Sequence, residues 1–379
     1  MSWDKASITG VGTSRMGSFP GVSSNQLAKE AFVDALADAG LTKHAIDGLI
    51  TMPGTTSPEG ANHYLAMGEL LGIDPRIAWS ISMGGATVGT LISQAALAIE
   101  AGMASTVAVI FGDAAKTGGS KFAAAAGGGD SWGIWGMFGN TANSALVASR
   151  HMGLYGTTSE QLGWVGVTTR KHAALNPMAI MREPYTIEEH QNSRMVVDPL
   201  HLLDCCIISD GAVAIIVTSP ERARANRTHP VRIMGMGQAN TLRKLDREDW
   251  WSMPQQKIAI DDAYRMAGVG PKDIDVAQLY DNFTISVLMW LEHGGFVKPG
   301  ESGPFVEGGE RISIGGELPI NTSGGNLSES YMQGWLHVVE GVRQMRHEGG
   351  PRQVEGAEVT LVTGRGFTLN TSAALVLGR

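Results

Sequence analysis

Two separate stretches of the chain repeat one pattern of apolar and polar positions. Residues 33–47 match residues 261–275 without a gap, from an Asp-Ala pair through Ala-Gly to an Ile-Asp pair. The apolar spacing in each copy is typical of a helix, and Gly40 and Gly268 stand where a left-handed C-terminal cap is expected. Each copy then turns mostly apolar again. The pattern predicts helix, glycine cap, short link and strand in both places.

The correspondence continues further along both stretches. Glycine pairs at 84–85 and at 324–325 are each followed by a helical run and then by a strand that is apolar throughout. Such strands, alternating with helices, are typical of sheets that are covered on both faces. We therefore predict two similar α/β halves in a layered architecture. The predicted elements are helices at 94–102 and 331–346 and strands at 106–112 and 358–364.

A less regular region interrupts the first half. Residues from about 114–200 carry Gly, Trp, Met and Pro without a clear period, and we interpret them as a long insertion. An apolar strand at 208–217 then completes this half. The polar residues 220–230 are either a linker or an ordinary surface helix. The predicted halves are thus 1–225 at the N-terminal end and 226–379 at the C-terminal end.

Composition places the chain among globular proteins and excludes several functions. Of its 379 residues, 43% are hydrophobic and 17% are charged, so the chain can bury a large core. The formal net charge is -8 and no basic cluster carries interleaved aromatic residues, so we expect no nucleic-acid partner. Neither a membrane span nor a signal peptide is visible. The adjacent Cys205 and Cys206 favour neither a disulfide nor a zinc motif, and we expect a cytoplasmic location.

Two short segments connect the duplicated pattern to a known superfamily. They are Ile-Ser-Asp-Gly-Ala at 208–212 and Asn-Thr-Ser-Gly-Gly at 321–325. Together with the repeat they resemble the thiolase superfamily over nearly the whole chain. The resemblance implies an α/β thiolase fold, in which two βαβαβαββ halves stack in five layers (αβαβα) and a loop domain is inserted in the first half. Within this superfamily, the chain most resembles the sterol-carrier-type thiolase-like proteins and their acyl-CoA aldolases of steroid side-chain degradation.

Both cysteines of thiolase chemistry are missing at the positions that the resemblance assigns to them. Counting back along the central helix of the first half puts Gly85 at the position of the nucleophile. The C-terminal Cys-x-Gly element reads Val362-Thr363-Gly364. Ser82 and Thr87 lie near Gly85, but neither has an identifiable base, and such residues at a helix start are commonly caps. The usual route to an acyl-enzyme is therefore excluded.

Two tyrosines occupy motif positions that thiolases fill with other polar residues. Tyr280, in Leu-Tyr-Asp-Asn-Phe, takes the place of the Asn or His that begins the Asn-Glu-Ala-Phe or His-Asp-Cys-Phe motif. Tyr331 takes the place of the histidine in the Gly-His-Pro loop. One tyrosine beside a strand end is more commonly a core residue. Two such positions, in a chain with only six tyrosines, favour a shared function, and the pair resembles the two tyrosines that carry the aldolase reaction.

The resemblance also implies roles for these residues. By the family's pattern, Tyr331 is the base and Tyr280 the donor on the enolate side. Because an ordinary phenol has a pKa near ~10, the base needs a neighbouring cation, a proton relay or strong hydrogen bonding. Backbone N–H groups of Gly85 and Gly364 are expected in an oxyanion hole. Further candidates are Asn321 and Gly325 for binding the oxyanion or substrate. Asp281 and Glu329 either orient the tyrosines or serve as turn or cap residues.

Other notable side chains are given structural interpretations. His293 and His337 lie on predicted helices without a second motif element, and we interpret them as structural or solvated. Cys205 and Cys206 are interpreted as small buried residues outside the site. Four large side chains in the insertion either line a wide apolar pocket or pack the loop domain or a dimer contact. These four are Trp132, Trp135, Met137 and Phe138.

The leading functional hypothesis is a carbon–carbon lyase that cleaves a β-hydroxyacyl-CoA by a retro-aldol reaction, with a steroid side-chain thioester as one such substrate. The alternatives are a thiolase-like acyltransferase with an atypical nucleophile and a non-catalytic lipid or acyl-CoA carrier subunit. Coenzyme A (CoA) enters as part of the substrate, and neither a bound cofactor nor a metal is expected. The resemblance further implies a homodimer and a separate small OB-fold/zinc-ribbon protein that helps to complete the site.

Overall fold

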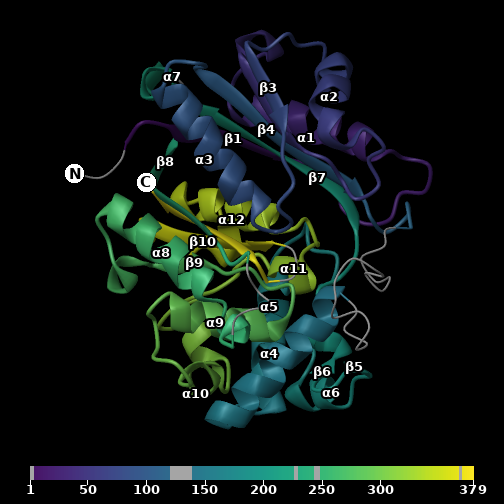
Figure 1. The fold of residues 1–379 in the computed structure, drawn as a ribbon, viewed down its shortest axis with the longest axis vertical. Helices are drawn as coiled ribbons and strands as arrows, with labels where there is room; N and C mark the ends of the chain where they lie inside the picture. The colour runs from purple at the N-terminus through teal and green to yellow at the C-terminus, as the bar shows by residue number, and fades with distance from the viewer. Residues whose placement is uncertain (1–3, 120–138, 226–228, 243–247, 367–368) are drawn as a thin grey trace.

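Strands from both halves of the chain form one mixed sheet. The computed structural model describes residues 4–119, 139–225, 229–242, 248–366 and 369–379 (Figure 1). The strand order is β3-β2-β4-β7-β1-β8-β11-β10-β9. Only Ser7 with Arg232 and Ile8 with Val231 pair β1 with β8, so the sheet divides there into two half-sheets. The strands are β1 (Ser7–Thr13), β2 (Gly48–Met52), β3 (Ile77–Ser80), β4 (Thr106–Ala114), β7 (Asp210–Thr218), β8 (Val231–Asn240), β9 (Val276–Gln278), β10 (Val359–Gly366) and β11 (Thr371–Gly378).

The two half-sheets have the same topology. In the first, β2 lies parallel to β3 and β4, and β7 runs antiparallel between β4 and β1. In the second, β9 is parallel to β10, and β11 runs antiparallel between β10 and β8. A parallel bridge from Ala277 to Ile320 takes the place of β3 beside β9. The duplication that the sequence predicts is therefore present in the fold.

Helices cover both faces of each half-sheet, which gives five layers (Figure 1). Helices α1 and α2 pack on the outer face of the first half-sheet, around Ile110 and Ile216. Helices α3 and α12 lie between the half-sheets and share one core with both, where Trp335 stacks on Phe111. Helices α8 and α9 pack on the outer face of the second half-sheet, around Val376. The layers agree with the predicted αβαβα order. These helices, with two short ones, are α1 (Ser24–Asp38), α2 (His63–Leu71), α3 (Thr87–Glu100), α8 (Pro254–Ala267), α9 (Thr284–His293), α10 (Ser302–Val306), α11 (Gly325–Ser328) and α12 (Trp335–Met345).

Equivalent residues hold equivalent turns in the two halves. Gly40 after α1 has a φ of 62°, and Gly268 after α8 has a φ of 73°. Both angles lie in the left-handed region that glycine adopts without a Cβ clash. Asp47 accepts hydrogen bonds from two backbone N–H groups at the start of β4, and Asp275 accepts two at the start of β10. The repeated Ile-Asp pair thus fixes the neighbouring parallel strand in each half.

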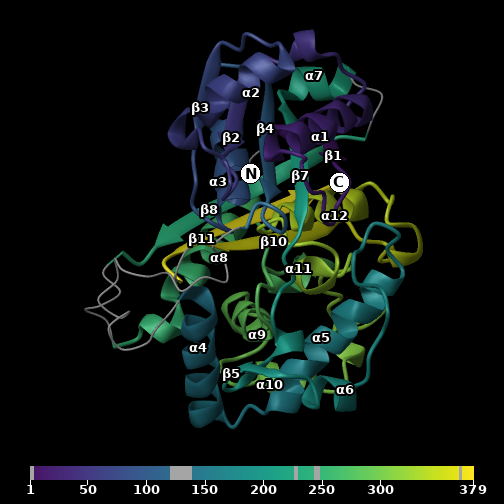
Figure 2. The same cartoon turned by 90° about the vertical axis from the view of Figure 1, so that its right-hand side faces the viewer.

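The segment between β4 and β7 is more regular than its sequence indicates. It contains α4 (Gly139–Tyr155), α5 (Ser159–Ala174), α6 (Ile187–Gln191), β5 (Met195–Val197) and β6 (Leu200–His201). The expectation of irregular structure is wrong for the described part of this insertion. Helix α5 buries polar side chains, among them those of Arg170 and His172, so it shows no clean apolar stripe. Figure 2 shows this segment at the lower end of the molecule, next to α9 and α10.

The junction between the halves contains a surface helix. The polar stretch after β7 begins with α7 (Pro220–Ala225), as one of the two interpretations expected. The predicted boundary between 225 and 226 adjoins residues 226–228, which lie outside the described residues, and it stays a prediction. Over the part of the chain that the structure describes, no helix is long and apolar enough to cross a membrane.

Candidate active site

The two tyrosines at the motif positions meet in the interior. Tyr280 follows the end of β9, and Tyr331 lies in the loop between α11 and α12. Their hydroxyl oxygens are 3.2 Å apart, and the residues are 2% and 8% exposed. Either phenol can donate this hydrogen bond. A proton can therefore pass between them, as acid–base chemistry requires.

Tyr280 fills the space that a side chain at residue 85 would need. Gly85 lies just before α3, at the position that the resemblance assigns to a nucleophilic cysteine. A Cβ atom on Gly85 would come closer than 3.0 Å to both Cζ and the hydroxyl oxygen of Tyr280, an approach that real Cβ atoms essentially never show. The phenol thus occupies the place of the missing side chain, and residue 85 must be glycine while Tyr280 is present.

The backbone around Tyr280 is held from two sides. The hydroxyl of Thr363 accepts a hydrogen bond from the Tyr280 N–H at 3.0 Å. Asn321 accepts from the Leu279 N–H at 2.7 Å and donates to the Leu279 carbonyl at 2.8 Å. Both polar groups of the Asn321 side chain are therefore committed to Leu279. These contacts place Asn321 against the backbone next to Tyr280, and its expected part in binding the oxyanion or substrate stays a prediction.

Asp281 anchors the start of α11. Its carboxylate accepts a hydrogen bond from the Asn326 N–H at 2.8 Å and lies 3.0 Å from Nε2 of His337. A Cβ atom on Gly325 would collide with this carboxylate, so glycine is needed there for the close approach. His337 is 1% exposed, which makes it a buried structural residue and not a solvated one. The expected parts of Gly325 in substrate binding and of Asp281 in orienting the tyrosines stay predictions.

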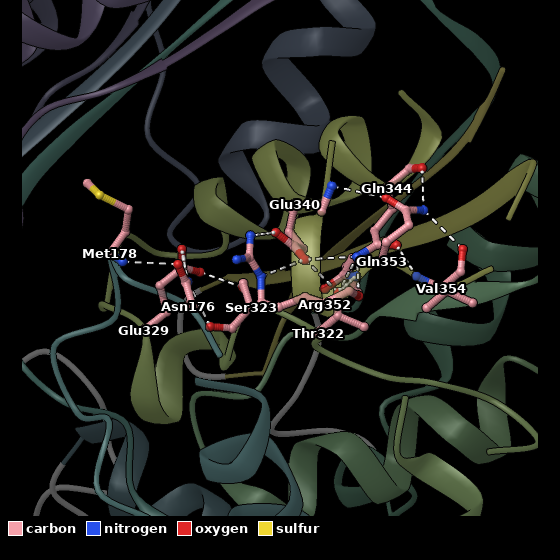
Figure 3. A network of polar contacts seen from close by, with 12 residues as sticks. Asn176, Met178, Thr322, Ser323, Glu329, Glu340, Gln344, Arg352, Gln353 and Val354 are labelled. Carbon is pink, nitrogen blue, oxygen red and sulfur yellow. Dashed lines mark hydrogen bonds and ion pairs between the residues drawn. The ribbon is translucent and has the colours of Figure 1, made fainter. Parts of the chain in front are cut away.

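Glu329 connects the loop before α12 to the insertion. Its carboxylate accepts hydrogen bonds from Ser323 Oγ at 2.5 Å and from Asn176 Nδ2 at 3.1 Å (Figure 3). Burial, together with the nearby carboxylate of Glu340, raises the pKa of Glu329 to about 7. Figure 3 also shows Glu340 paired with Arg352 in the same polar network. Asn176 follows α5, so Glu329 fixes the insertion against the second half, and its orienting role toward the tyrosines stays a prediction.

Two cavities border the tyrosine pair. The first, of about 270 Å³, is lined by both tyrosines, Gly85 and polar side chains of the loop after β2, and we call it the polar lobe. The second, of about 300 Å³, is lined mostly by apolar side chains around Ile207 and Phe283, and we call it the apolar lobe. Tyr331 borders both lobes, whereas Tyr280 borders the polar lobe. The site therefore offers two different surroundings on the two sides of Tyr331.

Arg365 belongs to the polar lobe although no sequence motif marks it. It lies near the end of β10, is 2% exposed and donates a hydrogen bond to Asn282 Oδ1 at 2.8 Å. Sequence reasoning missed it. Two signals in the sequence together point to it, namely the chemical need for a cation beside a basic tyrosine and the position of Arg365 directly after the Val362-Thr363-Gly364 element.

Burial dominates the electrostatics of the pair. It raises the pKa of Tyr280 and that of Tyr331 above the ordinary phenol value, so both phenols are protonated near neutral pH. The positive charge of Arg365 acts in the opposite direction and lowers both pKa values. Burial in turn lowers the pKa of Arg365 to about 10, which leaves its guanidinium charged at neutral pH.

The nearby hydroxyl and thiol groups are poor nucleophiles. The Thr87 hydroxyl accepts a hydrogen bond from the Met83 N–H at 2.8 Å and donates to the Gly84 carbonyl, so both of its contacts hold the turn before α3. Cys206, placed outside the site by sequence reasoning, lines the apolar lobe next to Tyr331. Burial raises the pKa of its thiol well above the ordinary value, which disfavours the reactive thiolate.

The other candidate residues are placed as follows. Gly85 lines the polar lobe, whereas Gly364 packs so closely on the Gly85 carbonyl that a Cβ atom there would collide with it. Within the described ranges, no three His, Cys, Asp or Glu side chains are grouped to hold a metal ion. The predicted pocket residues of the insertion lie outside the described residues. These are Trp132, Trp135, Met137 and Phe138.

Known proteins with the same architecture share long stretches of sequence with this chain. Residues 237–379 match the thiolase C-terminal domain-like family. The 17-hydroxy-3-oxo-4-pregnene-20-carboxyl-CoA lyase of Mycobacterium tuberculosis is 38% identical over 392 residues, which cover 99% of this chain and 99% of that protein. The chain belongs to the thiolase superfamily. The steroid side-chain-cleaving aldolase of Thermomonospora curvata is another relative. It is 37% identical over 390 residues, which cover 98% of this chain and 97% of that protein.

Solved structures of thiolase-superfamily members agree with this assignment. The Ltp2–ChsH2(DUF35) aldolase superposes with a TM-score of 0.88 at 36% identity, over 99% of this chain and 97% of that chain. Human mitochondrial 3-ketoacyl-CoA thiolase superposes with a TM-score of 0.74 at 13% identity, over 99% of this chain and 98% of that chain. The second comparison shows the fold alone. The first places this chain beside the side-chain aldolases within the superfamily, as its sequence motifs predict.

Proposed function

We propose that this chain is an acyl-CoA lyase that cleaves a β-hydroxyacyl-CoA by a retro-aldol reaction. The observation that carries the proposal is the pair of buried phenols in contact, one of which fills the space beside Gly85, the position that the family resemblance assigns to the thiolase nucleophile. Two weak acids without a thiolate can move protons but offer no usual route to a covalent acyl-enzyme. The names of the two relatives, a carboxyl-CoA lyase and a side-chain-cleaving aldolase, support the same reaction class.

The proposed reaction moves protons and one electron pair. One tyrosine first releases its own proton to solvent; as the phenolate it takes the proton of the β-hydroxyl group, and the Cα–Cβ bond breaks as a carbonyl forms at Cβ. The electron pair of the broken bond becomes the thioester enolate. The second tyrosine then donates its proton to Cα, which releases a shortened acyl-CoA and a ketone or aldehyde. A proton transfer across the 3.2 Å between the two hydroxyl groups restores the original pair.

We assign the base role to Tyr331 and the enolate-side donor role to Tyr280. Tyr331 borders both lobes, so it is placed to reach a β-hydroxyl group on a ring held in the apolar lobe. Tyr280 borders the polar lobe and lies against Gly85, just before α3. Backbone N–H groups at a helix start stabilise a developing oxyanion. This neighbourhood supports Tyr280 and Gly85 on the thioester side of the substrate.

We further propose a steroid side-chain thioester of CoA as the substrate. The names of both relatives contain a steroid skeleton or a steroid side chain, which supports this substrate class. The apolar lobe, of about 300 Å³, suits part of a hydrophobic ring system. CoA takes part as the thiol half of the substrate, and the proposed proton transfers are carried by protein side chains.

We also propose assembly with a separate small OB-fold/zinc-ribbon protein and a homodimer in the cytoplasm. The Ltp2–ChsH2(DUF35) aldolase, similar to this chain over nearly its whole length, contains a ChsH2(DUF35) component. This supports a partner of that kind for the present chain. The homodimer and the cytoplasmic location rest on the family resemblance and on the sequence composition.

The test is direct assay of bond cleavage. The chain is incubated, with and without its OB-fold partner, with β-hydroxyacyl-CoA thioesters that include one with a tertiary hydroxyl group on a steroid ring. Mass spectrometry then measures the shortened acyl-CoA, and we expect it to form with the steroid thioester in the presence of the partner. A covalent acyl adduct on the intact protein would instead support an acyltransferase. Tight binding of several thioesters without any cleavage would support a carrier.

A further inference from the structure

Arg365 holds a positive charge in the interior, and the described part of the chain supplies it with no carboxylate partner. Its guanidinium donates hydrogen bonds to Asn282 Oδ1 at 2.8 Å, to Ser144 Oγ at 3.4 Å and to Met253 Sδ at 3.4 Å. All three acceptors are uncharged. Among the residues that the structure describes, no carboxylate lies within 4.0 Å of this guanidinium.

Two other buried arginines show the more usual arrangement. Arg352 lies 3.0 Å from the carboxylate of Glu340 (Figure 3), and Arg346 lies 2.8 Å from that of Asp38. A buried guanidinium without a counter-charge costs stability, because water no longer solvates it. An uncompensated buried charge that lines a cavity is therefore a candidate for a functional group.

The groups around Arg365 become negative only when they lose a proton. The titratable groups that interact electrostatically with the Arg365 guanidinium are the phenols of Tyr280 and Tyr331 and the thiol of Cys206. Asp281 also acts on Tyr280, and there it opposes ionisation of the phenol. Arg365 is the positive charge that favours a phenolate at both tyrosines.

We propose that Arg365 is a positioning residue for the tyrosine pair, whose guanidinium supplies the counter-charge for the phenolate and for the thioester enolate that forms from the substrate. The inference rests on the proposed retro-aldol function and supplies the cation that this function requires. A phenol in a buried cavity ionises readily only beside a positive charge. A guanidinium suits this task because it stays charged when buried, whereas an ammonium group loses its proton more easily. Asn282, which borders both lobes, holds it in place.

The test compares Arg365→Gln and Arg365→Lys with the wild-type chain in complex with its partner, as kcat/KM for steroid-thioester cleavage across pH. Arg365→Gln should lower kcat/KM by about 10²-fold at neutral pH. It should also move the acidic limb of the profile to higher pH by about one unit, because the phenol loses its counter-charge.

Arg365→Lys should keep most of the neutral-pH activity but gain a falling alkaline limb. A buried lysine loses its charge at a lower pH than a guanidinium, and the phenolate then loses its support. The pH profile of Arg365→Lys tests the proposed role of Arg365 even if Arg365→Gln does not fold. A lysine variant that shows no such alkaline limb would overturn the proposal.

Arg346→Gln is the matched control, because Arg346 is buried and pairs with Asp38 of α1, and neither residue lines the polar or the apolar lobe. It should lower the melting temperature and leave both limbs of the pH profile in place. If the acidic limb of Arg365→Gln also stays in place, Arg365 is only structural and the inference is wrong.

A measurement without substrate separates this inference from the proposed function. Ultraviolet absorbance of tyrosinate is titrated in the wild type, in Arg365→Gln and in Tyr331→Phe, which identifies the signal of Tyr331. This phenol should ionise at lower pH in the wild type than in Arg365→Gln. If the wild type cleaves no thioester but shows this difference, the proposed function fails and the electrostatic role of Arg365 stands.

Discussion

Replacing Gly85 by alanine tests whether Tyr280 takes the place of the thiolase nucleophile. The added Cβ would come closer than 3.0 Å to Cζ and the hydroxyl oxygen of Tyr280. Non-bonded carbon atoms rest about 3.5–4.0 Å apart, so the phenol must move by more than about half an ångström. Its ring is enclosed, with Tyr280 only 2% exposed. Such overpacking costs about 1–3 kcal/mol, and a shift of ~1 Å in a catalytic group can cost ~10²-fold in rate.

Two measurements check the prediction, the free energy of unfolding from denaturant titration and kcat for acyl-CoA cleavage. Gly85→Ala should lower the free energy of unfolding by about 1–3 kcal/mol and kcat by about 10²-fold. Gly153→Ala in α4 is the control, because no atom lies within 4 Å of the Cβ it adds. In a Tyr280→Ala background the cost of Gly85→Ala to stability should nearly vanish, since the colliding ring is gone.

Two results would refute this reasoning. The first is a Gly85→Ala variant with wild-type kcat and wild-type unfolding free energy, which would mean that the cavity accommodates both side chains. The second is an equal loss of unfolding free energy with and without the Tyr280 ring. In that case the cost would come from other neighbours of residue 85, and Tyr280 would not be the occupant of the nucleophile's space.

Three further changes probe separate parts of the site. Tyr331→Phe keeps the ring and removes the hydroxyl, so kcat for cleavage should fall about 10²–10⁴-fold without a change in melting temperature, and an unchanged rate would disprove the base assignment. Thr363→Val leaves the Tyr280 N–H without its acceptor, which should lower the unfolding free energy by about 1–3 kcal/mol in denaturant titration. Glu329→Gln removes a carboxylate whose pKa burial raises from 4.5 to about 7. Because the folded chain keeps this proton at pH values where the unfolded chain has lost it, wild-type unfolding free energy should decline as pH rises from 4.5 through about 7, and the variant should flatten that decline.

The fold could be predicted from the sequence because the same pattern of residues occurs in both halves of the chain. The Ala-Gly and Ile-Asp pairs recur at the same spacing, and in the structure each aspartate holds the start of the next parallel strand. At the Ile-Asp pairs, the element that the local sequence predicts is also the one that the tertiary hydrogen bonds hold in place. The helices of the insertion were harder to predict, because α5 buries polar residues such as Arg170 and so lacks the apolar period that indicates a surface helix.

The site could be predicted only as far as motifs mark it. Tyr280 and Tyr331 replace motif residues, and the fold brings their hydroxyl groups within 3.2 Å. Asn321 also stands in a motif, but motifs do not show which backbone an amide will pair with, and here it is that of Leu279. Arg365 enters the site through the pairing of β10 and β9, a contact between distant segments that no local pattern contains.

The glycine at residue 85 and the tyrosine at residue 280 depend on each other. The Tyr280 phenol needs the volume of a side chain at residue 85, so a cysteine there and the phenol cannot coexist in this geometry. The second lost cysteine position, Val362, is followed by Thr363, whose hydroxyl holds the Tyr280 N–H. Of the two positions that the family resemblance assigns to cysteines, one thus contacts the phenol and the other adjoins a residue that binds the Tyr280 backbone. The packing of the phenol against Gly85 leaves no room for a side chain at residue 85, and it supports the proposed proton transfer over acyl transfer.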